Sequence, residues 1–241
     1  MHFCIFTALL MLTSCGRSAD PAAREKELTY LRSVVPDELL EFAHVEVPAV
    51  ENVAIMGEGS TQHLGLHVFP GQKKLNGGIR AEVSVDYPCK QGGTVRYAWR
   101  FMVPKGFVSD APKNRWWIIG QWHDQPDRAR GESWDGFASK SPPVLLGLGE
   151  FQGKLGSGIG IAYGPVFIEP GKWHSIAVEI HWSQKADGKA TFFFDDMSKP
   201  AATGPNMHND FQHFLKLGMY RHPEIETDNW IYIDDLKITK M

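Results

Sequence analysis

The sequence predicts an all-β protein, an antiparallel sandwich of two sheets arranged as a jelly roll. From His63 onward, short stretches of alternating apolar and polar residues are separated by Gly, Pro, Asn and Asp, which is the pattern of strands joined by turns. Only one segment, near the N-terminus, has helical character. The chain has 241 residues, 43% of them hydrophobic and 22% charged, which fits one globular domain.

The first segment is predicted to be a targeting signal. Residues 1–14 contain an apolar core that is too short to span a bilayer. This core ends in Leu-Thr-Ser followed by Cys15, which resembles a bacterial lipobox. The resemblance implies a lipoprotein signal peptide over 1–14 and lipidation of Cys15. We therefore expect an exported bacterial lipoprotein of the periplasm, outer membrane or cell surface, which meets the membrane only through this lipid anchor.

Residues 15–42 are polar and favour a helix, because Asp20 can cap it and Pro21 suits its first turn. We expect this segment to be a linker to the lipid anchor or to pack on the outside of the domain. The β-domain is then predicted to cover 43–241.

Ten segments share the composition and alternation of strands. They are 63–69, 79–87, 93–103, 115–123, 143–150, 157–163, 172–182, 189–195, 213–221 and 229–239. The longest irregular stretch, 124–142, follows the fourth of them, and loops of this length are often functional.

Composition excludes several classes of function. The formal net charge of −3 gives no sign of nucleic-acid binding. Cys89 is the one cysteine inside the predicted domain, so the fold does not depend on an internal disulfide. The histidines lack a compact metal-ligand spacing, which argues against catalytic zinc. The 8 Trp residues fit either core packing or a cleft in which flat rings stack on sugars.

The strand 115–123 ends in an amide and an imidazole. Side chains alternate along a strand. One face is predicted to carry Trp117, Ile119, Gln121 and His123. The other face is predicted to carry Trp116, Ile118 and Trp122. An apolar strand with this polar ending is predicted to form the floor of a polar cleft.

Other strands also combine an apolar face with a polar face. The polar face of 79–87 carries Arg80, Glu82, Ser84 and Asp86, and that of 93–103 carries Arg96 and Arg100. In 213–221, Phe214, Lys216, Gly218 and Tyr220 share a face. If such faces lie on one sheet, they form a groove suited to a polyanion.

The order of several motifs resembles polysaccharide lyases of the heparinase I and glucuronan lyase type. The motifs are Arg-Ala-Glu (80–82), Gln-Trp-His (121–123), Gly-Lys-Trp-His (171–174), Phe-Leu-Lys-Leu-Gly-Met-Tyr-Arg (214–221) and Ile-Tyr-Ile-Asp-Asp-Leu (231–236). The resemblance implies a concanavalin-like jelly roll that cleaves a uronic-acid polysaccharide by β-elimination. It further implies His123 and Tyr220 as the catalytic pair. The implied substrate-binding residues are Gln121, Arg80, Lys216 and Arg221.

This chemistry requires such residue types. Removal of the C5 proton of a uronate builds negative charge on the neighbouring carboxylate, which donors or cations must stabilise. A base takes the proton and an acid protonates the leaving oxygen. His, with a pKa of about 6.5, and Tyr, with a pKa of about 10, suit these tasks. We favour Tyr220 as the proton donor, and as an alternative it is also the base of a syn elimination. His123 is either the base or a group that neutralises the carboxylate.

Further expectations concern cofactors, partners and alternatives. The chemistry needs no cofactor, although a structural calcium ion held by Asp234 is a weak candidate, because related sandwich folds often bind one through the last strand. The expected partner is an acidic polysaccharide (glucuronan, alginate or a heparin-like chain), and we expect a monomer. Two alternatives remain, a non-catalytic carbohydrate-binding domain and a glycoside hydrolase, which would need two carboxylates that face the scissile bond.

Overall fold

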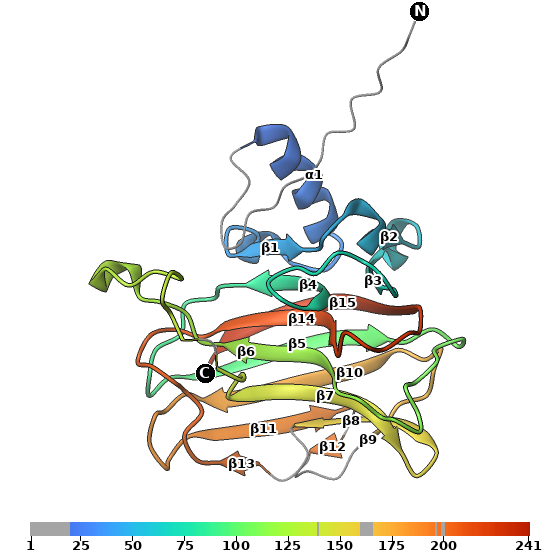
Figure 1. The fold of residues 1–241 in the computed structure, drawn as a ribbon. Helices are drawn as coiled ribbons and strands as arrows, with labels where there is room; N and C mark the ends of the chain where they lie inside the picture. Colours follow the sequence, from blue (N-terminus) through green and yellow to red (C-terminus); the bar gives the residue numbers. More distant parts are fainter. Residues whose placement is uncertain (1–19, 139, 160–165, 196, 199–200) are drawn as a thin grey trace, which may run out of the picture.

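The computed structural model describes residues 20–138, 140–159, 166–195, 197–198 and 201–241. The predicted signal peptide and Cys15 lie outside these residues. Within them, two antiparallel sheets form a sandwich, with one α-helix, α1 (Pro21–Leu31), at its edge (Figure 1). None of the helices in the described part of the chain is long and apolar enough to cross a membrane.

We call the first sheet the cleft sheet. Its strands, in spatial order, are β1 (Ala43–Glu46), β4 (Ile79–Val85), β14 (Phe214–Arg221), β6 (Trp117–His123), β7 (Val144–Phe151), β8 (Lys154–Ile159) and β9 (Val166–Phe167).

We call the second sheet the back sheet. Its strands, in spatial order, are β12 (Met197–Ser198), β11 (Lys189–Phe194), β10 (His174–His181), β5 (Thr94–Met102), β15 (Asn229–Lys240), β3 (His63–Val68) and β2 (Val53–Met56). A further short strand, β13 (Ala202–Thr203), pairs with β11. Four short 3₁₀ helices lie in the connections, at Asp37–Leu39, Val50–Asn52, Gly59–Thr61 and Arg128–Arg130.

Each of the ten predicted strands matches a strand in the described residues, although 160–163 of the predicted strand 157–163 lie outside them, and the prediction of a two-sheet jelly roll is confirmed. The sequence patterns missed β1, β2, β9, β12 and β13, which are two to four residues long. So few residues show too little alternation to be separated from a loop. The omission of β1 matters, because this strand contributes to the cleft described below.

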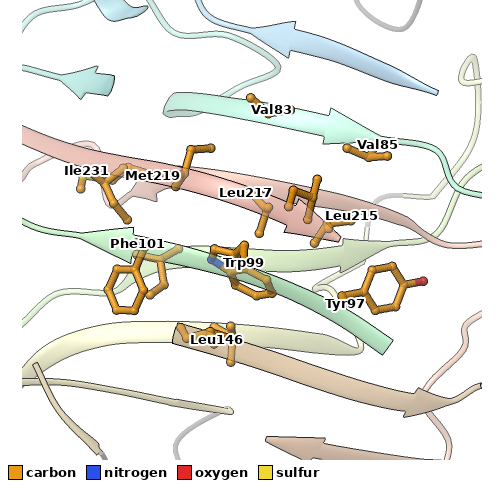
Figure 2. Packing of buried hydrophobic residues seen from close by; sticks show 14 of the residues in the cluster. Val83, Val85, Tyr97, Trp99, Phe101, Leu146, Leu215, Leu217, Met219 and Ile231 are labelled. Carbon is orange, nitrogen blue, oxygen red and sulfur yellow. The ribbon is translucent and has the colours of Figure 1, made fainter. Parts of the chain in front are cut away.

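The core fills the space between the two sheets (Figure 2). Large side chains of β5 meet aliphatic side chains of β14 and β4 there. The labelled examples are Tyr97, Trp99 and Phe101 on β5, Leu215, Leu217 and Met219 on β14, and Val83 and Val85 on β4, all at most 3% exposed. Full burial of such a side chain contributes about 1.5–3 kcal/mol. Because this packing holds every second residue of β4 and β14 inward, the residues between them face out of the sandwich.

The N-terminal segment packs on the edge of the cleft sheet. Leu31 and Leu39 belong to the buried core, and the carboxylate of Glu27 accepts a hydrogen bond of 2.7 Å from the backbone N–H of Val45 in β1. Residues 20–42 are therefore attached to the β-sandwich and hold β1 in place beside β4.

Candidate active site

A cleft of about 1310 Å³ lies on the outer face of the cleft sheet. Its floor comes from the outward residues of β1, β4, β14, β6 and β7, and part of the irregular stretch 124–142 lines one end. The polar faces predicted on 79–87, 115–123 and 213–221 thus lie on one sheet. Arg96 and Arg100 do not join them, because β5 belongs to the back sheet, where these residues pair with Glu179 and Asp234.

A β-bulge in β6 changes which of its residues face the cleft. The pairing of β6 with both neighbours shifts between Ile118 and Gly120. Trp117 and Ile119 are buried in the core, although Trp117 also borders the cleft, whereas Trp116 and Ile118 line the cleft beside His123. The predicted face with Trp117 and Ile119 beside Gln121 and His123 is therefore wrong, because one extra residue reverses the alternation along half of the strand.

Tyr220 occupies one end of the floor. The guanidinium carbon of Arg80 lies 4.1 Å from the centre of the Tyr220 ring, and the ring of Trp116 meets it edge-on at 4.8 Å. Gly78 contacts the third side of this ring, since a Cβ there would lie 2.2 Å from Tyr220 Cε2. The ring is thus held in one position by two side chains and a backbone segment.

Gly218, in the Lys-x-Gly-x-Tyr motif, allows β14 to approach β4 closely. Its φ of +140° is rarely adopted by residues with a Cβ, and a Cβ at this position would lie 2.3 Å from the Ala81 carbonyl oxygen. Glycine at this position therefore permits the close pairing of β14 with β4.

Two carboxylates organise the polar floor. Glu82 accepts a hydrogen bond of 3.2 Å from Arg80 and one of 2.5 Å from the Gln121 amide nitrogen. Glu46, on β1, accepts a hydrogen bond of 2.7 Å from Lys216 Nζ, and it lies 3.2 Å from the His44 ring. All of these side chains except His44 are buried.

These pairs determine the charge of the floor. Burial raises the pKa of Glu46, but the charge of Lys216 and the hydrogen bond to His44 outweigh it and lower the pKa well below its usual value. Arg80 and Lys216 are therefore already paired with carboxylates. Among the described residues that line the cleft, Lys140 is an exposed cation with no ion pair.

Three buried polar atoms beneath the cleft have no partner among the described residues: Gln121 Oε1, Arg80 Nε and Ser84 Oγ. An unsatisfied buried polar group is unfavourable by about 1–3 kcal/mol. A polar ligand or water that reaches this part of the floor removes that penalty, which is the arrangement expected of a binding site for a hydroxylated molecule.

His123 lies towards the other end of the floor. Its ring stacks on Phe214 at 6.0 Å, and Nδ1 lies 3.7 Å from a carboxylate oxygen of Asp124. Burial raises the pKa of Asp124, but the interactions with His123 and with nearby histidines outweigh it and lower the pKa below its usual value.

His123 and Tyr220 lie at opposite ends of the floor. His123 pairs with Phe214 and Tyr220 pairs with Ile118. The two backbone positions are therefore five residues apart along β6, roughly 16 Å. Gln121 and Lys216 form a cross-strand pair between them.

Arg221, predicted to bind substrate, does not line the cleft. It is fully buried on the core side of β14, donates to Asn229 Oδ1 at 2.6 Å and to the Thr227 carbonyl at 2.7 Å, and lies over the Trp117 ring. Burial lowers its pKa to about 10. The prediction that Arg221 binds substrate is wrong, because side chains alternate along a strand and residues 220 and 221 point to opposite faces.

The calcium candidate Asp234 lies on the back sheet, 3.4 Å from the guanidinium of Arg100. Within the described ranges, no group of three or more His, Cys, Asp or Glu is arranged to hold a metal ion.

Several cleft residues escaped the sequence patterns. His44 and Glu46 alternate with Ala43, Val45 and Val47, and this short period-two signal could have revealed β1. Trp116, Trp134 and Lys140 carried no such signal, because their position over the cleft depends on the bulge in β6 and on the conformation of 124–142.

Comparisons with known proteins agree with this fold. A sequence model of the family described as polysaccharide lyase matches residues 49–237. No curated protein matches the chain. The endo-β-1,4-glucuronan lyase of the fungus Trichoderma reesei is similar in structure, with a TM-score of 0.58, 16% identity, and coverage of 77% of this chain and 85% of that one.

Two alginate lyases are also similar in structure. Alginate lyase vAL-1 from Chlorella virus has a TM-score of 0.56 and 11% identity, over 89% of this chain and 97% of that one. A variant of alginate lyase Aly36B in complex with alginate trisaccharide has a TM-score of 0.52 and 14% identity, over 83% and 88%.

Proposed function

This chain belongs to the polysaccharide lyase family, and we propose that it cleaves a uronic-acid-containing polysaccharide by β-elimination in the cleft beside Tyr220. The observation that carries the proposal is the continuous set of contacts on the floor, from Tyr220 through Arg80 and Glu82 to Gln121. These contacts join the phenol of Tyr220 to the groups suited to hold a carboxylate.

In the proposed reaction, a uronate ring lies over Gln121 and Lys216. Its carboxylate is held by the amide and by the nearby positive charges, which stabilise the negative charge that develops when the C5 proton leaves. Tyr220 delivers a proton to O4 as the C4–O4 bond breaks and the C4–C5 double bond forms. The C5 proton goes either to His123, from the opposite end of the floor, or, in a syn elimination, to the Tyr220 oxygen as this oxygen gives its own proton to O4.

The charge of the cleft supports an acidic substrate. Lys140 is exposed at the rim and has no carboxylate partner among the described residues. A substrate carboxylate provides such a partner, whereas a neutral sugar does not. We propose an unsulfated polyuronate such as glucuronan or alginate, since the floor cations Arg80 and Lys216 are already paired and few remain for sulfate groups.

A glycoside hydrolase fits this cleft less well. Inverting and retaining hydrolases need two carboxyl groups that are free to act as acid and as base or nucleophile. Here Glu46 and Glu82 are buried and held by Lys216, Arg80 and Gln121. Carboxylates fixed in this way serve to position cations.

The test is an assay of purified protein on glucuronan, alginate and heparin, which follows the ultraviolet absorbance of the unsaturated sugar. A lyase raises this absorbance, a hydrolase releases reducing ends without it, and a binding domain does neither. We expect Tyr220→Phe and His123→Ala to abolish the signal while the circular dichroism spectrum remains that of the wild type. Full activity in either variant would rule out the assigned pair.

A further inference from the structure

Exposed large hydrophobic side chains gather in the cleft. Seven such side chains are exposed in the described part of the chain, and Trp116, Trp134 and Phe151 among them line the cleft. Trp116 is 42% exposed and Trp134 is 38% exposed. Exposed apolar rings that gather in one cleft are typical of a ligand-binding groove.

The two tryptophans mark opposite ends of the floor. Trp116 contacts Tyr220, with ring centres 4.8 Å apart, and Trp134 contacts Phe214, with ring centres 6.3 Å apart. Phe214 and Tyr220 both face the cleft from β14 and are six residues apart, which is roughly 20 Å along a strand. One sugar ring cannot reach from one tryptophan to the other, whereas a polymer can.

Ion pairs fix the chain segments that carry the two tryptophans. Arg130 binds both carboxylate oxygens of Asp210, at 2.7 and 2.9 Å, and so anchors the stretch that carries Trp134. Arg115, next to Trp116, binds both oxygens of Asp110 at 2.7 Å. Pre-positioned rings lose little conformational entropy when a ligand covers them.

We propose that Trp116 and Trp134 are stacking platforms for sugar rings on the two sides of the scissile bond. The substrate chain then runs along β14, past Tyr220, and is cut at internal positions. The carbon-bound hydrogens of a pyranose ring form an apolar face, and its contact with an indole removes apolar area from water. This inference rests on the proposed function, because it assumes that the bond is broken beside Tyr220.

Oligosaccharides of increasing length test the proposal. For the wild type we expect early products of several sizes, and a kcat/KM that rises with chain length until both tryptophans are covered. In Trp134→Ala, KM for long chains should rise about tenfold, with kcat for saturating polymer nearly unchanged. In Trp116→Ala, KM for long chains should rise similarly and kcat should also fall, because Trp116 holds one side of the Tyr220 ring. Trp173→Ala is the matched control, since Trp173 is partly exposed on the back sheet against Arg100 and His63.

The outcomes separate this inference from the proposed function. Early products of a single small size, or an unchanged length dependence in both cleft variants, would overturn it while the lyase assignment stands. Titration of intrinsic fluorescence with the same oligosaccharides measures binding without cleavage. If no unsaturated product forms from any polyuronate, the proposed function fails, and weaker binding in the two cleft variants alone still supports the stacking platforms.

Discussion

Replacing Gly78 by alanine should displace Tyr220 without straining the backbone. The φ of Gly78 is not positive, so alanine fits its backbone conformation. The added Cβ would lie 2.2 Å from Tyr220 Cε2 and 3.0 Å from Cζ. Carbon atoms pack at about 3.5–4.0 Å, so the ring has to retreat by roughly 1.3 Å. Because Arg80 and Trp116 hold the other sides of the ring, its retreat disturbs both contacts.

A misplacement of about 1 Å at a reacting group lowers the rate by about 100-fold, which is about 2.7 kcal/mol in the activation barrier. We therefore expect kcat of Gly78→Ala on the best polyuronate to fall by about 100-fold. The free energy of unfolding should fall by about 1–3 kcal/mol, as for other overpacked sites. Initial rates of ultraviolet absorbance increase measure the first quantity, and urea unfolding measures the second.

Gly106→Ala is the matched control. No heavy atom lies within 4 Å of a Cβ at Gly106, and its φ is not positive. This variant should keep wild-type kcat and stability. If Gly78→Ala also keeps wild-type kcat while folded, the position of the Tyr220 ring does not limit the reaction and its assignment as the proton donor is wrong.

Three other perturbations have expected outcomes. Glu46→Gln leaves the buried ammonium of Lys216 without its carboxylate, so urea unfolding should show that the free energy of unfolding falls by about 3–5 kcal/mol. The added substitution Lys216→Met should recover part of this stability, and a fall below about 1 kcal/mol in Glu46→Gln would contradict a buried pair. Lys140→Gln should raise KM for the acidic polymer and weaken its dependence on salt, with kcat unchanged, whereas an unchanged KM would remove Lys140 from substrate binding. Burial lowers the pKa of His213 to about 4 from 6.5, so the unfolded chain binds a proton first as pH falls. The free energy of unfolding should therefore have its full value above pH 6.5 and fall by up to about 3 kcal/mol towards pH 4. If His213→Gln loses the same stability over this pH range, the protonation of His213 is not the cause.

The alternation of side chains predicted part of the candidate site correctly. On 79–87 it placed Arg80 and Glu82 away from the core, and on 213–221 it placed Lys216 and Tyr220 together, because β4 and β14 pair without a shift. On β6 the same rule failed at Ile119, since the bulge adds one residue against β7. A bulge depends on how neighbouring strands pair, so the sequence of one strand alone does not predict it.

The sequence by itself determined the class of the protein. Ten alternating segments with turns between them bury their apolar faces as a sandwich or a barrel. The motifs around His123 and Tyr220 pointed to the polysaccharide lyases, a family that the match over residues 49–237 confirms.

Only the tertiary structure decided how the cleft is built. It brought Glu46, on a strand of four residues, to Lys216 across 170 positions of the chain, and it buried Arg221 below β14. It also placed Trp116 and Trp134 at the two ends of one floor. The physical reason is that alternation assigns a side chain to one of two faces, whereas strand order and register decide which side chains become neighbours.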